Sequence, residues 1–300
     1  MSKANRPWQG RTEGGDFGLR FLLWFLKYVN LHVGYCFVAT SIPFYLIFRR
    51  KARNEIYNFF RYKMGFSPWT AAKSTIKQHY RFGQVLMDKL TVLARGKADF
   101  KVFIDGEELF NQLIDSDEGF VITGAHVGNF ELAGYLLKQD KKKIYSVIFG
   151  GEEPVLQQYR FKQFEHSNGI MIPIREDMSH LFQINAALDR GDIVSMPADR
   201  HFGSDKSAVC PFFGANAKFP IGAFQLAAAK NVPTILLLVI KESTKQYRIF
   251  VRRLDVQPCA GENKKQLAQR IACRYAQELE HIVRQYPEQW FNFYDFWNLS

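Results

Sequence analysis

A histidine and a glutamate stand five positions apart in the segment GAHVGNFEL, residues 124–132. The apolar run FVIT before it predicts a buried strand, which places His126 in the turn that follows. If Glu131 lies in the first turn of the next helix, its carboxylate can fold back toward the imidazole. A carboxylate that accepts a hydrogen bond from one ring nitrogen leaves the other nitrogen free to take a proton. The pattern therefore predicts a general base, His126, with Glu131 behind it.

The residues between this pair bear on the same chemistry. Gly124 and Gly128 permit a tight turn and the close approach of a substrate. The start of the predicted helix would also offer backbone N–H groups to a developing oxyanion. Asn129 is a candidate substrate-binding residue, although a local role at the helix start is the preferred interpretation. An incidental histidine beside an ordinary capped helix is the alternative for the whole segment.

A second polar block, ADRHFG at residues 198–203, follows another apolar stretch at residues 192–197. Ligands of α/β proteins bind where the carboxyl ends of parallel strands meet. Asp199 and Arg200 are therefore expected at the same sheet edge as His126, and both are candidate substrate-binding residues. The planar guanidinium of Arg200 suits a phosphate group, and an ion pair with Asp199 or a neighbour is the alternative.

Other chemistries are disfavoured. His126, Asp199 and His201 are suitable types of metal ligand, but no His-x-x-x-His or cysteine cluster accompanies them, so we expect no metal. The sequence contains neither a Gly-x-Ser-x-Gly elbow nor a Gly-x-x-x-x-Gly-Lys phosphate loop. The four cysteines are far apart and form no Cys-x-x-Cys pair, which disfavours a disulfide framework and favours a reducing compartment.

The elements that must position these residues alternate along the chain. Strands are predicted at residues 97–105, 120–124, 144–149, 170–174, 192–197, 234–240 and 247–254, and helices at 129–138, 154–165, 180–190, 219–230 and 263–285. Short strands separated by helices predict an α/β fold with a central, mainly parallel or mixed sheet flanked by helices. Residues 52–95 are predicted to be helical. The expected boundary lies near residue 98, between an N-terminal helical region, residues 1–97, and an α/β domain, residues 98–300.

A hydrophobic stretch, residues 17–48, begins the N-terminal region. Its second half, residues 31–48, contains no formally charged residue over 18 positions, which is near the lower limit for crossing a bilayer. Arg49, Arg50 and Lys51 follow directly, and such residues favour the cytoplasmic side of a membrane. A single spanning helix and a helical hairpin lying in the interface both fit this pattern, with a buried core helix as the alternative.

The positive charge of the chain is concentrated in this same region. The net charge is +11, and residues 1–100 carry 17 Lys and Arg against 5 Asp and Glu, whereas the remaining 200 carry 23 against 24. An anionic membrane surface attracts such a segment, and nucleic acid would attract the charge as well. Because only a membrane also accounts for the apolar aromatic run, we expect a membrane lipid and not a nucleic acid as partner.

Several ordered blocks of this sequence resemble a known family. They are GAHVGNFELAG, MPADRHFGSDKSAVCPFFG, GAFQLAAAKNVPTILLLV and PEQWFNFYDFW, after an N-terminal hydrophobic anchor. Together they resemble the lysophospholipid acyltransferase superfamily, and more closely its branch of bacterial lipid A late acyltransferases, the lauroyl and myristoyl transferases. The resemblance covers most of the chain.

This resemblance implies roles for individual residues. It implies that His126 is the general base for an acceptor hydroxyl, that Glu131 positions it, and that Asp199 matches the acid of the second block. Members of the branch usually carry an arginine shortly before the strand predicted here at residues 170–174. In this sequence His166 stands at about that position, and Arg160, a further candidate substrate-binding residue, lies upstream.

The function that follows is transfer of a fatty acyl group from an acyl-carrier-protein or coenzyme A thioester to a hydroxyl, or amine, of a lipid or glycolipid. No cofactor beyond the donor is expected, and acyl carrier protein is a possible partner. The expected location is the bacterial inner membrane, with the catalytic domain on the cytoplasmic side. The alternative is a membrane lipid-binding or scaffold protein that has the same fold without the chemistry.

Overall fold

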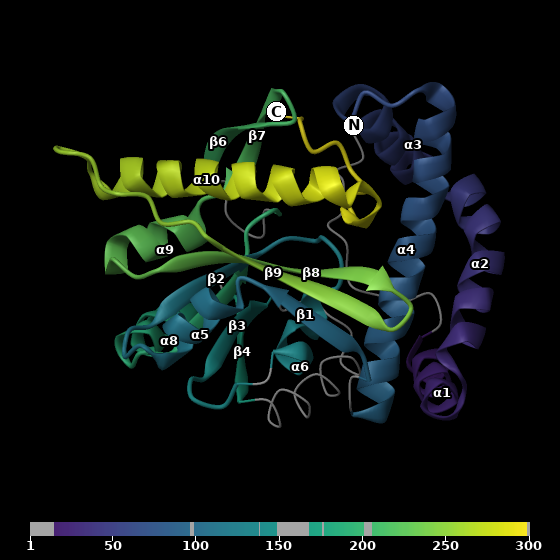
Figure 1. Ribbon diagram of the computed structural model, residues 1–300, viewed down its shortest axis with the longest axis horizontal. Coiled ribbons are helices and arrows are strands. Elements are labelled where there is room, and N and C mark those ends of the chain that lie inside the picture. Colours follow the sequence, from purple (N-terminus) through teal and green to yellow (C-terminus); the bar gives the residue numbers. More distant parts are fainter. Residues whose placement is uncertain are drawn as a thin grey trace.

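A seven-stranded sheet forms the centre of the computed structural model, which describes residues 15–96, 99–137, 139–148, 168–175, 177–200 and 206–298 (Figure 1). Its strands are β1 (Lys101–Asp105), β2 (Phe120–Gly124), β3 (Ile144–Ile148), β4 (Gly169–Pro173), β5 (Ile193–Pro197), β8 (Thr234–Ser243) and β9 (Gln246–Arg253). The order is β1-β9-β8-β2-β5-β3-β4, and every neighbouring pair is parallel except β8 and β9. The predicted α/β fold with a mainly parallel, mixed sheet is confirmed.

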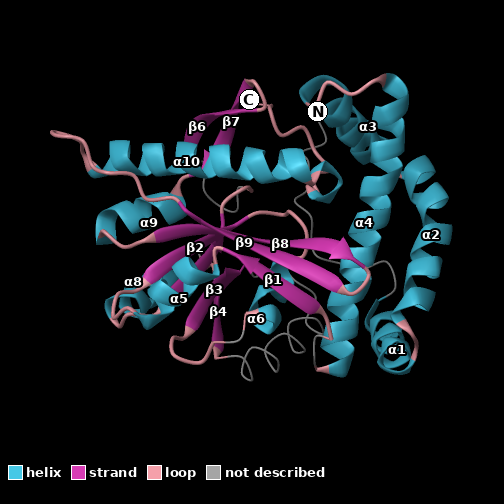
Figure 2. Cartoon of the chain, in the orientation of Figure 1, coloured by secondary structure: helices cyan, strands magenta, loops and turns pink. Residues whose placement is uncertain are grey.

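Helices cover both faces of this sheet because its central strands are apolar on both sides (Figure 2). They include α5 (Glu107–Asp115), α8 (Ser179–Asp189), α9 (Gly222–Lys230) and α10 (Lys264–Gln285). Strand β8 is buried along its first eight residues. Leu236, Leu238 and Ile240 of β8 face the core that α10 closes, and the alternate residues face the core that contains α5.

The sequence did not predict a second, two-stranded sheet. Strands β6 (Ser207–Phe212) and β7 (Ala215–Pro220) form an antiparallel hairpin, turned by Phe213 and Gly214, both at positive φ. Because β7 takes up the start of the helix predicted at residues 219–230, that helix begins at Gly222. The helix predicted at residues 129–138 is also shorter, a 3-10 turn (Phe130–Leu132) followed by α6 (Ala133–Leu136). The helix predicted at residues 154–165 lies outside the described residues.

The N-terminal region is helical, as predicted. It contains α1 (Gly15–Tyr28), α2 (Leu31–Phe48), α3 (Arg50–Asn58), a π-helical turn (Phe59–Lys63) and the long α4 (Pro68–Arg95). Helices α1 and α2, joined at Asn30, are called the N-terminal helix pair below. Both pack on the outer side of α4, with α2 beside α4 and α1 seen end-on in Figure 1. Gly83 of α4 allows the close approach, since a Cβ there would lie 2.2 Å from a methyl carbon of Val38.

The N-terminal helix pair turns a large apolar surface to the outside. Only Gly34, Tyr35 and Val38 of α2 are buried, so α2 is not a core helix. Phe21, Trp24, Phe37, Phe44 and Phe48 are among its exposed side chains. Helix α2 is long and apolar enough to cross a membrane by length and composition, which makes it a candidate anchor.

Candidate active site

His126 lies in the turn beyond the carboxyl end of β2, as the sequence predicts. Strands β2 and β5 are paired with Gly124 opposite Pro197, so the chain leaves the sheet at the same edge after each strand. Ala198 N–H donates to the Gly124 carbonyl at 2.9 Å and holds the two turns together. This pairing of parallel strands brings Asp199 to His126, although 73 positions separate them in the sequence.

The carboxylate behind the imidazole belongs to Asp199. Its Oδ1 lies 2.9 Å from Nδ1 of His126, and its Oδ2 accepts the backbone N–H of the same residue at 2.8 Å. The Asp199 side chain is 2% exposed and that of His126 is 20% exposed. A proton on Nδ1 satisfies this hydrogen bond, and Nε2 is then available to take a proton from a substrate. Such an arrangement can orient an imidazole for proton transfer at a partly open position.

Glu131, which the sequence placed behind the imidazole, has a different partner. Its Oε2 lies 2.5 Å from Nζ of Lys89 on α4. The predicted long helix does not form, and Gly128 at a φ of 60° turns the chain before the short 3-10 segment. The expectation that Glu131 orients His126 is therefore corrected, because Asp199 holds that position.

Asp199 is suited to stay ionised. Burial by itself would raise the pKa of this carboxyl, but His126, through its charge and hydrogen bonds, and Arg200 outweigh that effect and hold the pKa below its usual value. Tyr275, fully buried beside it, donates its hydroxyl to the Gly124 carbonyl at 2.9 Å and stays protonated because burial raises its pKa. An anionic carboxylate next to an imidazole stabilises the imidazolium that proton abstraction would create.

Arg200 points to the C-terminal segment. One guanidinium nitrogen donates to the Phe291 carbonyl at 2.7 Å, and the group lies 5.9 Å from the centre of the Tyr294 ring. Among the described residues no ion pair joins Arg200 to Asp199, and the Phe291 carbonyl is the hydrogen-bond partner of its guanidinium. Its neighbours at positions 201–205 lie outside the described residues, and contact of Arg200 with a substrate stays a prediction.

Asn129 faces the interior and not the open side of the site. It is 2% exposed, and its side-chain amide donates to the Val85 carbonyl at 3.1 Å and to the Tyr247 hydroxyl at 3.2 Å. Its backbone N–H donates to the Val239 carbonyl at 2.7 Å. These contacts favour the local structural role over contact with a substrate.

The C-terminal segment is a part of the site that the sequence did not predict. The backbone of residues 126–128 pairs with that of residues 289–291: Phe291 N–H donates to the His126 carbonyl at 2.9 Å, and Gly128 N–H donates to the Gln289 carbonyl at 2.8 Å. The N–H groups of Gly128 and Asn129 are thus occupied and are not free for an oxyanion. The signal in the sequence was the presence of six aromatic residues between positions 290 and 297. In the structure Trp290 is buried against the core.

Some predicted residues lie outside the described part of the chain. Arg160, His166 and His201 are among them, so the predicted substrate contact of Arg160 stays a prediction. Among the described residues there is no cluster of three or more His, Cys, Asp or Glu that could hold a metal ion.

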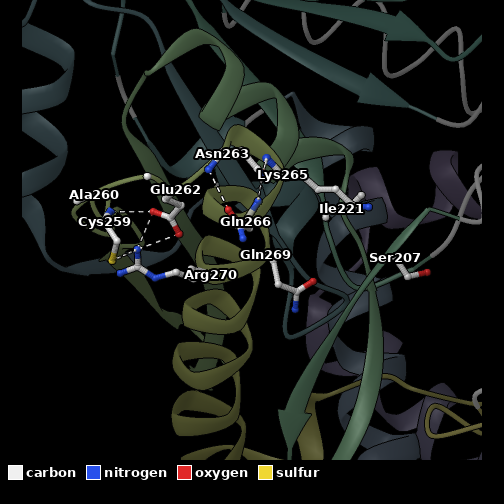
Figure 3. Close-up of a pocket in the computed structure, with 11 residues that line it drawn as sticks. Ser207, Ile221, Cys259, Ala260, Glu262, Asn263, Lys265, Gln266, Gln269 and Arg270 are labelled. Carbon is white, nitrogen blue, oxygen red and sulfur yellow. Dashed lines mark hydrogen bonds and ion pairs between the residues drawn. The ribbon is translucent and has the colours of Figure 1, made fainter.

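A cavity of about 720 Å³ lies elsewhere. It surrounds the start of α10, where Arg270 pairs with Glu262 beside Cys259 (Figure 3). None of its lining residues belongs to the group around His126. The cavity is therefore separate from the candidate active site, whose evidence is the geometry of the imidazole and its carboxylate.

Comparison with known proteins adds independent information. A family model described as bacterial lipid A biosynthesis acyltransferase matches residues 66–298. This match includes α4, the whole sheet, both residues of the His126–Asp199 pair and the C-terminal segment. No curated protein matches the chain.

Proposed function

Because the chain belongs to the bacterial lipid A biosynthesis acyltransferase family, we propose that it transfers a fatty acyl group from a thioester to a lipid. The donor is an acyl-carrier-protein or coenzyme A thioester, and the acceptor is a hydroxyl, or amine, of a lipid or glycolipid. The observation that carries the proposal is the pair formed by His126 and the buried Asp199 at the edge of the sheet. A scaffold has no need of an oriented, partly exposed imidazole.

In this mechanism Nε2 of His126 takes the proton of the acceptor hydroxyl while the oxygen attacks the thioester carbonyl carbon. The new carbon–oxygen bond forms, the carbon–sulfur bond breaks, and the thiolate leaves and takes the proton from the imidazolium. Asp199 holds the ring through Nδ1 and stabilises its positive charge during these steps. Arg200, on the same sheet edge, is the proposed contact for a phosphate of donor or acceptor.

Glu131 has a positioning role in this proposal. Its ion pair with Lys89 ties the segment after His126 to α4. The pair is partly buried, with 25% of the Glu131 side chain and 16% of the Lys89 side chain exposed. Loss of this carboxylate would release the segment and leave a cation in a partly dry environment.

The proposed location is the cytoplasmic face of the bacterial inner membrane. Support comes from the exposed aromatic side chains of the N-terminal helix pair and from Arg49, Arg50 and Lys51, which follow it. Aromatic and apolar groups enter the interface, and basic groups attract anionic headgroups. A basic surface also suits an acidic carrier protein as donor.

The test is release of free thiol by purified protein supplied with an acyl thioester and a lipid acceptor. We expect His126→Ala to abolish turnover while the protein stays folded and sediments with membranes. A matched control is His281→Ala, because His281 is exposed on α10 and contacts Gln285. Turnover by His126→Ala at the wild-type rate would contradict the mechanism. A wild-type protein that binds lipid but consumes no thioester would support the scaffold alternative.

A further inference from the structure

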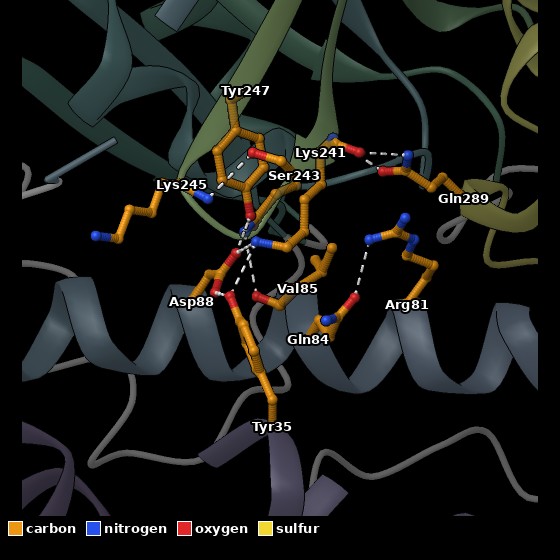
Figure 4. Close-up of polar contacts among 11 residues, drawn as sticks. Tyr35, Arg81, Gln84, Val85, Asp88, Lys241, Ser243, Lys245, Tyr247 and Gln289 are labelled. Carbon is orange, nitrogen blue, oxygen red and sulfur yellow. Dashed lines mark hydrogen bonds and ion pairs between the residues drawn. The ribbon is translucent and has the colours of Figure 1, made fainter. Parts of the chain in front are cut away.

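A buried polar cluster joins α2 of the N-terminal helix pair to the sheet (Figure 4). Asp88 of α4 and Lys241 of β8 form an ion pair at 2.5 Å, and both side chains are fully buried. Tyr35 of α2 donates to Oδ1 of Asp88, and Tyr247 of β9 donates to Oδ2. Lys241 Nζ also donates to the Tyr35 hydroxyl at 2.9 Å. Four separate elements therefore meet at one carboxylate.

This cluster depends on each of its donors. Burial raises the pKa of Asp88 and lowers that of Lys241, and the mutual contact of the two groups with the hydrogen bonds of Tyr35 and Tyr247 to Asp88 opposes these shifts. The rings of Tyr35, Phe100 and Tyr247 surround the ammonium at 5.0–5.6 Å. A buried pair of this kind contributes little stability by itself but fixes how the elements around it are arranged.

Two routes lead from the cluster to the candidate active site. In the first, the Tyr247 hydroxyl accepts from the side chain of Asn129, three residues after His126. In the second, the backbone of Lys241 exchanges two hydrogen bonds of 2.9 Å with the Gln289 side chain, and the Gln289 carbonyl accepts from Gly128. Both routes end on the segment of residues 126–129 that presents the imidazole.

We propose that Tyr35 is a positioning residue, through which docking of the N-terminal helix pair on α4 orders the His126–Asn129 segment. The hydroxyl of Tyr35 reaches Asp88 only when α2 lies against α4, where Val38 and Gly83 are in close contact. Undocking removes one donor from a buried carboxylate, and the Asp88–Tyr247–Asn129 contacts must then rearrange. The inference rests on the proposed function, because it makes acyl transfer depend on the part of the chain that faces the membrane.

Tyr35→Phe tests this coupling by removal of a single hydroxyl. Tyr45→Phe is the matched control, since Tyr45 lies on the same helix and contacts the ring of His79 outside the cluster. We expect Tyr35→Phe to lower kcat ~10-fold through misplacement of the base, with KM for the acyl thioester unchanged and the control at wild-type kcat. Hydrogen exchange of the peptide covering residues 125–132 should be faster in Tyr35→Phe only.

Exchange also separates this proposal from the proposed function, because it needs no turnover. If the wild-type protein consumes no thioester, faster exchange in Tyr35→Phe would still support the coupling. Only the acyltransferase proposal would then fail. Unchanged exchange at residues 125–132 in folded Tyr35→Phe, or an equal change in Tyr45→Phe, would overturn the coupling. If Tyr35→Phe does not fold, Tyr247→Phe removes the hydroxyl that links Asp88 to Asn129. Exchange at residues 125–132 as slow in this variant as in the wild type would then overturn the coupling.

Discussion

At the scale of the residue, one carboxylate serves both the backbone and the side chain of His126. Asp199 accepts the N–H of the turn with one oxygen and faces Nδ1 of the ring with the other. The imidazole is thereby fixed in position and in tautomer at the same time. This double contact explains why the acid at this edge of the sheet is buried. A carboxylate that bound a substrate there would need to be exposed.

Replacement of Asp199 by Asn should remove the charge and keep the shape. We expect kcat of Asp199→Asn to fall by ~100-fold or more, because the amide can present an N–H to Nδ1 and favours the wrong tautomer. Thiol release measured across pH, with circular dichroism as the check on folding, tests this. A variant with wild-type kcat would show that the buried carboxylate does not act on the base.

The same residue predicts a pH dependence of stability. The pKa of Asp199 is held below its usual value in the folded protein. The ionised carboxylate therefore adds to the free energy of unfolding at pH values above the ordinary Asp pKa of about 4, and this contribution is lost as the pH falls through the lower pKa of the folded protein. We expect the difference in free energy of unfolding between wild type and Asp199→Asn to persist at pH 5 and to shrink below about pH 4. Urea unfolding at several pH values measures it, and a difference that vanishes at pH 5 would contradict the depressed pKa.

The local spacing of residues identified His126 as the candidate base but did not identify Asp199 as the carboxylate that contacts it. The five-residue interval to Glu131 is visible in the sequence, whereas the contact with Asp199 exists only because β2 and β5 are adjacent parallel strands. Asp199 and Arg200 were expected at the correct edge, yet as substrate contacts. Burial, which decides between a positioning and a binding role, is a property of the folded chain and could not be predicted from the motif.

At the scale of the element, α4 organises the site from outside the sheet. Its Lys89 pairs with Glu131, its Val85 carbonyl accepts from Asn129, and its Gln78 donates to the Trp290 carbonyl at 2.8 Å. Three contacts along one helix thus fix the histidine segment and the C-terminal segment together. The family match begins at residue 66, which includes this helix with the α/β part. The domain boundary predicted near residue 98 stays a prediction.

The hairpin β6–β7 contacts α10 through two free cysteines that lie far apart in the sequence. The sulfur atoms of Cys210 and Cys273 lie 2.9 Å apart, whereas Cys36 and Cys259 are exposed. Burial raises the pKa of the Cys210 thiol, so the more exposed Cys273 is the thiol that a reagent reaches first. Spacing alone gave no hint of this pair, since it depends on how the hairpin packs.

Mild oxidation should join these two elements covalently. With diamide, an azo oxidant that is reduced to the hydrazine, the two thiols lose two protons and two electrons, and we expect a Cys210–Cys273 disulfide. Peptide mapping under non-reducing conditions detects the link, and Cys273→Ser is the control that cannot form it. Recovery of only free thiols at these positions would contradict the packing of β6 on α10.

Each element that the sequence patterns missed has its own physical cause. Phe213 takes a positive φ that side chains rarely adopt, so the β6–β7 turn lacks the usual Asn-Gly or Asp-Gly signal. The helix expected after His126 is replaced by short turns because Val127 and Gly128 pair with the C-terminal segment instead. Long apolar strands such as β8 were predictable, since burial on both faces requires a continuous apolar run.

At the scale of the whole molecule, charge and apolar surface are concentrated together. The excess of Lys and Arg lies in residues 1–100, and the exposed aromatic side chains of α1 and α2 lie in the same third of the chain. An interfacial protein needs both, because apolar groups give affinity for the bilayer and basic groups select anionic lipid. The N-terminal third is therefore expected to govern membrane binding, and the α/β part to contribute little to it.

Neutralisation of the basic segment after α2 tests this division. We expect a variant with Arg49, Arg50 and Lys51 all changed to Gln to bind vesicles containing anionic lipid roughly 100-fold more weakly at low salt, at about fivefold per charge. The difference in affinity between this variant and the wild type should nearly disappear at high salt, where the charges are screened. It should also disappear on neutral vesicles, where only the apolar surface of α1 and α2 acts. A matched variant that removes the exposed Lys245, Lys264 and Lys265 changes the net charge equally but lies on the α/β part, and it should bind as the wild type does. Equal weakening by the two variants would mean that net charge, and not the N-terminal surface, holds the protein at the membrane.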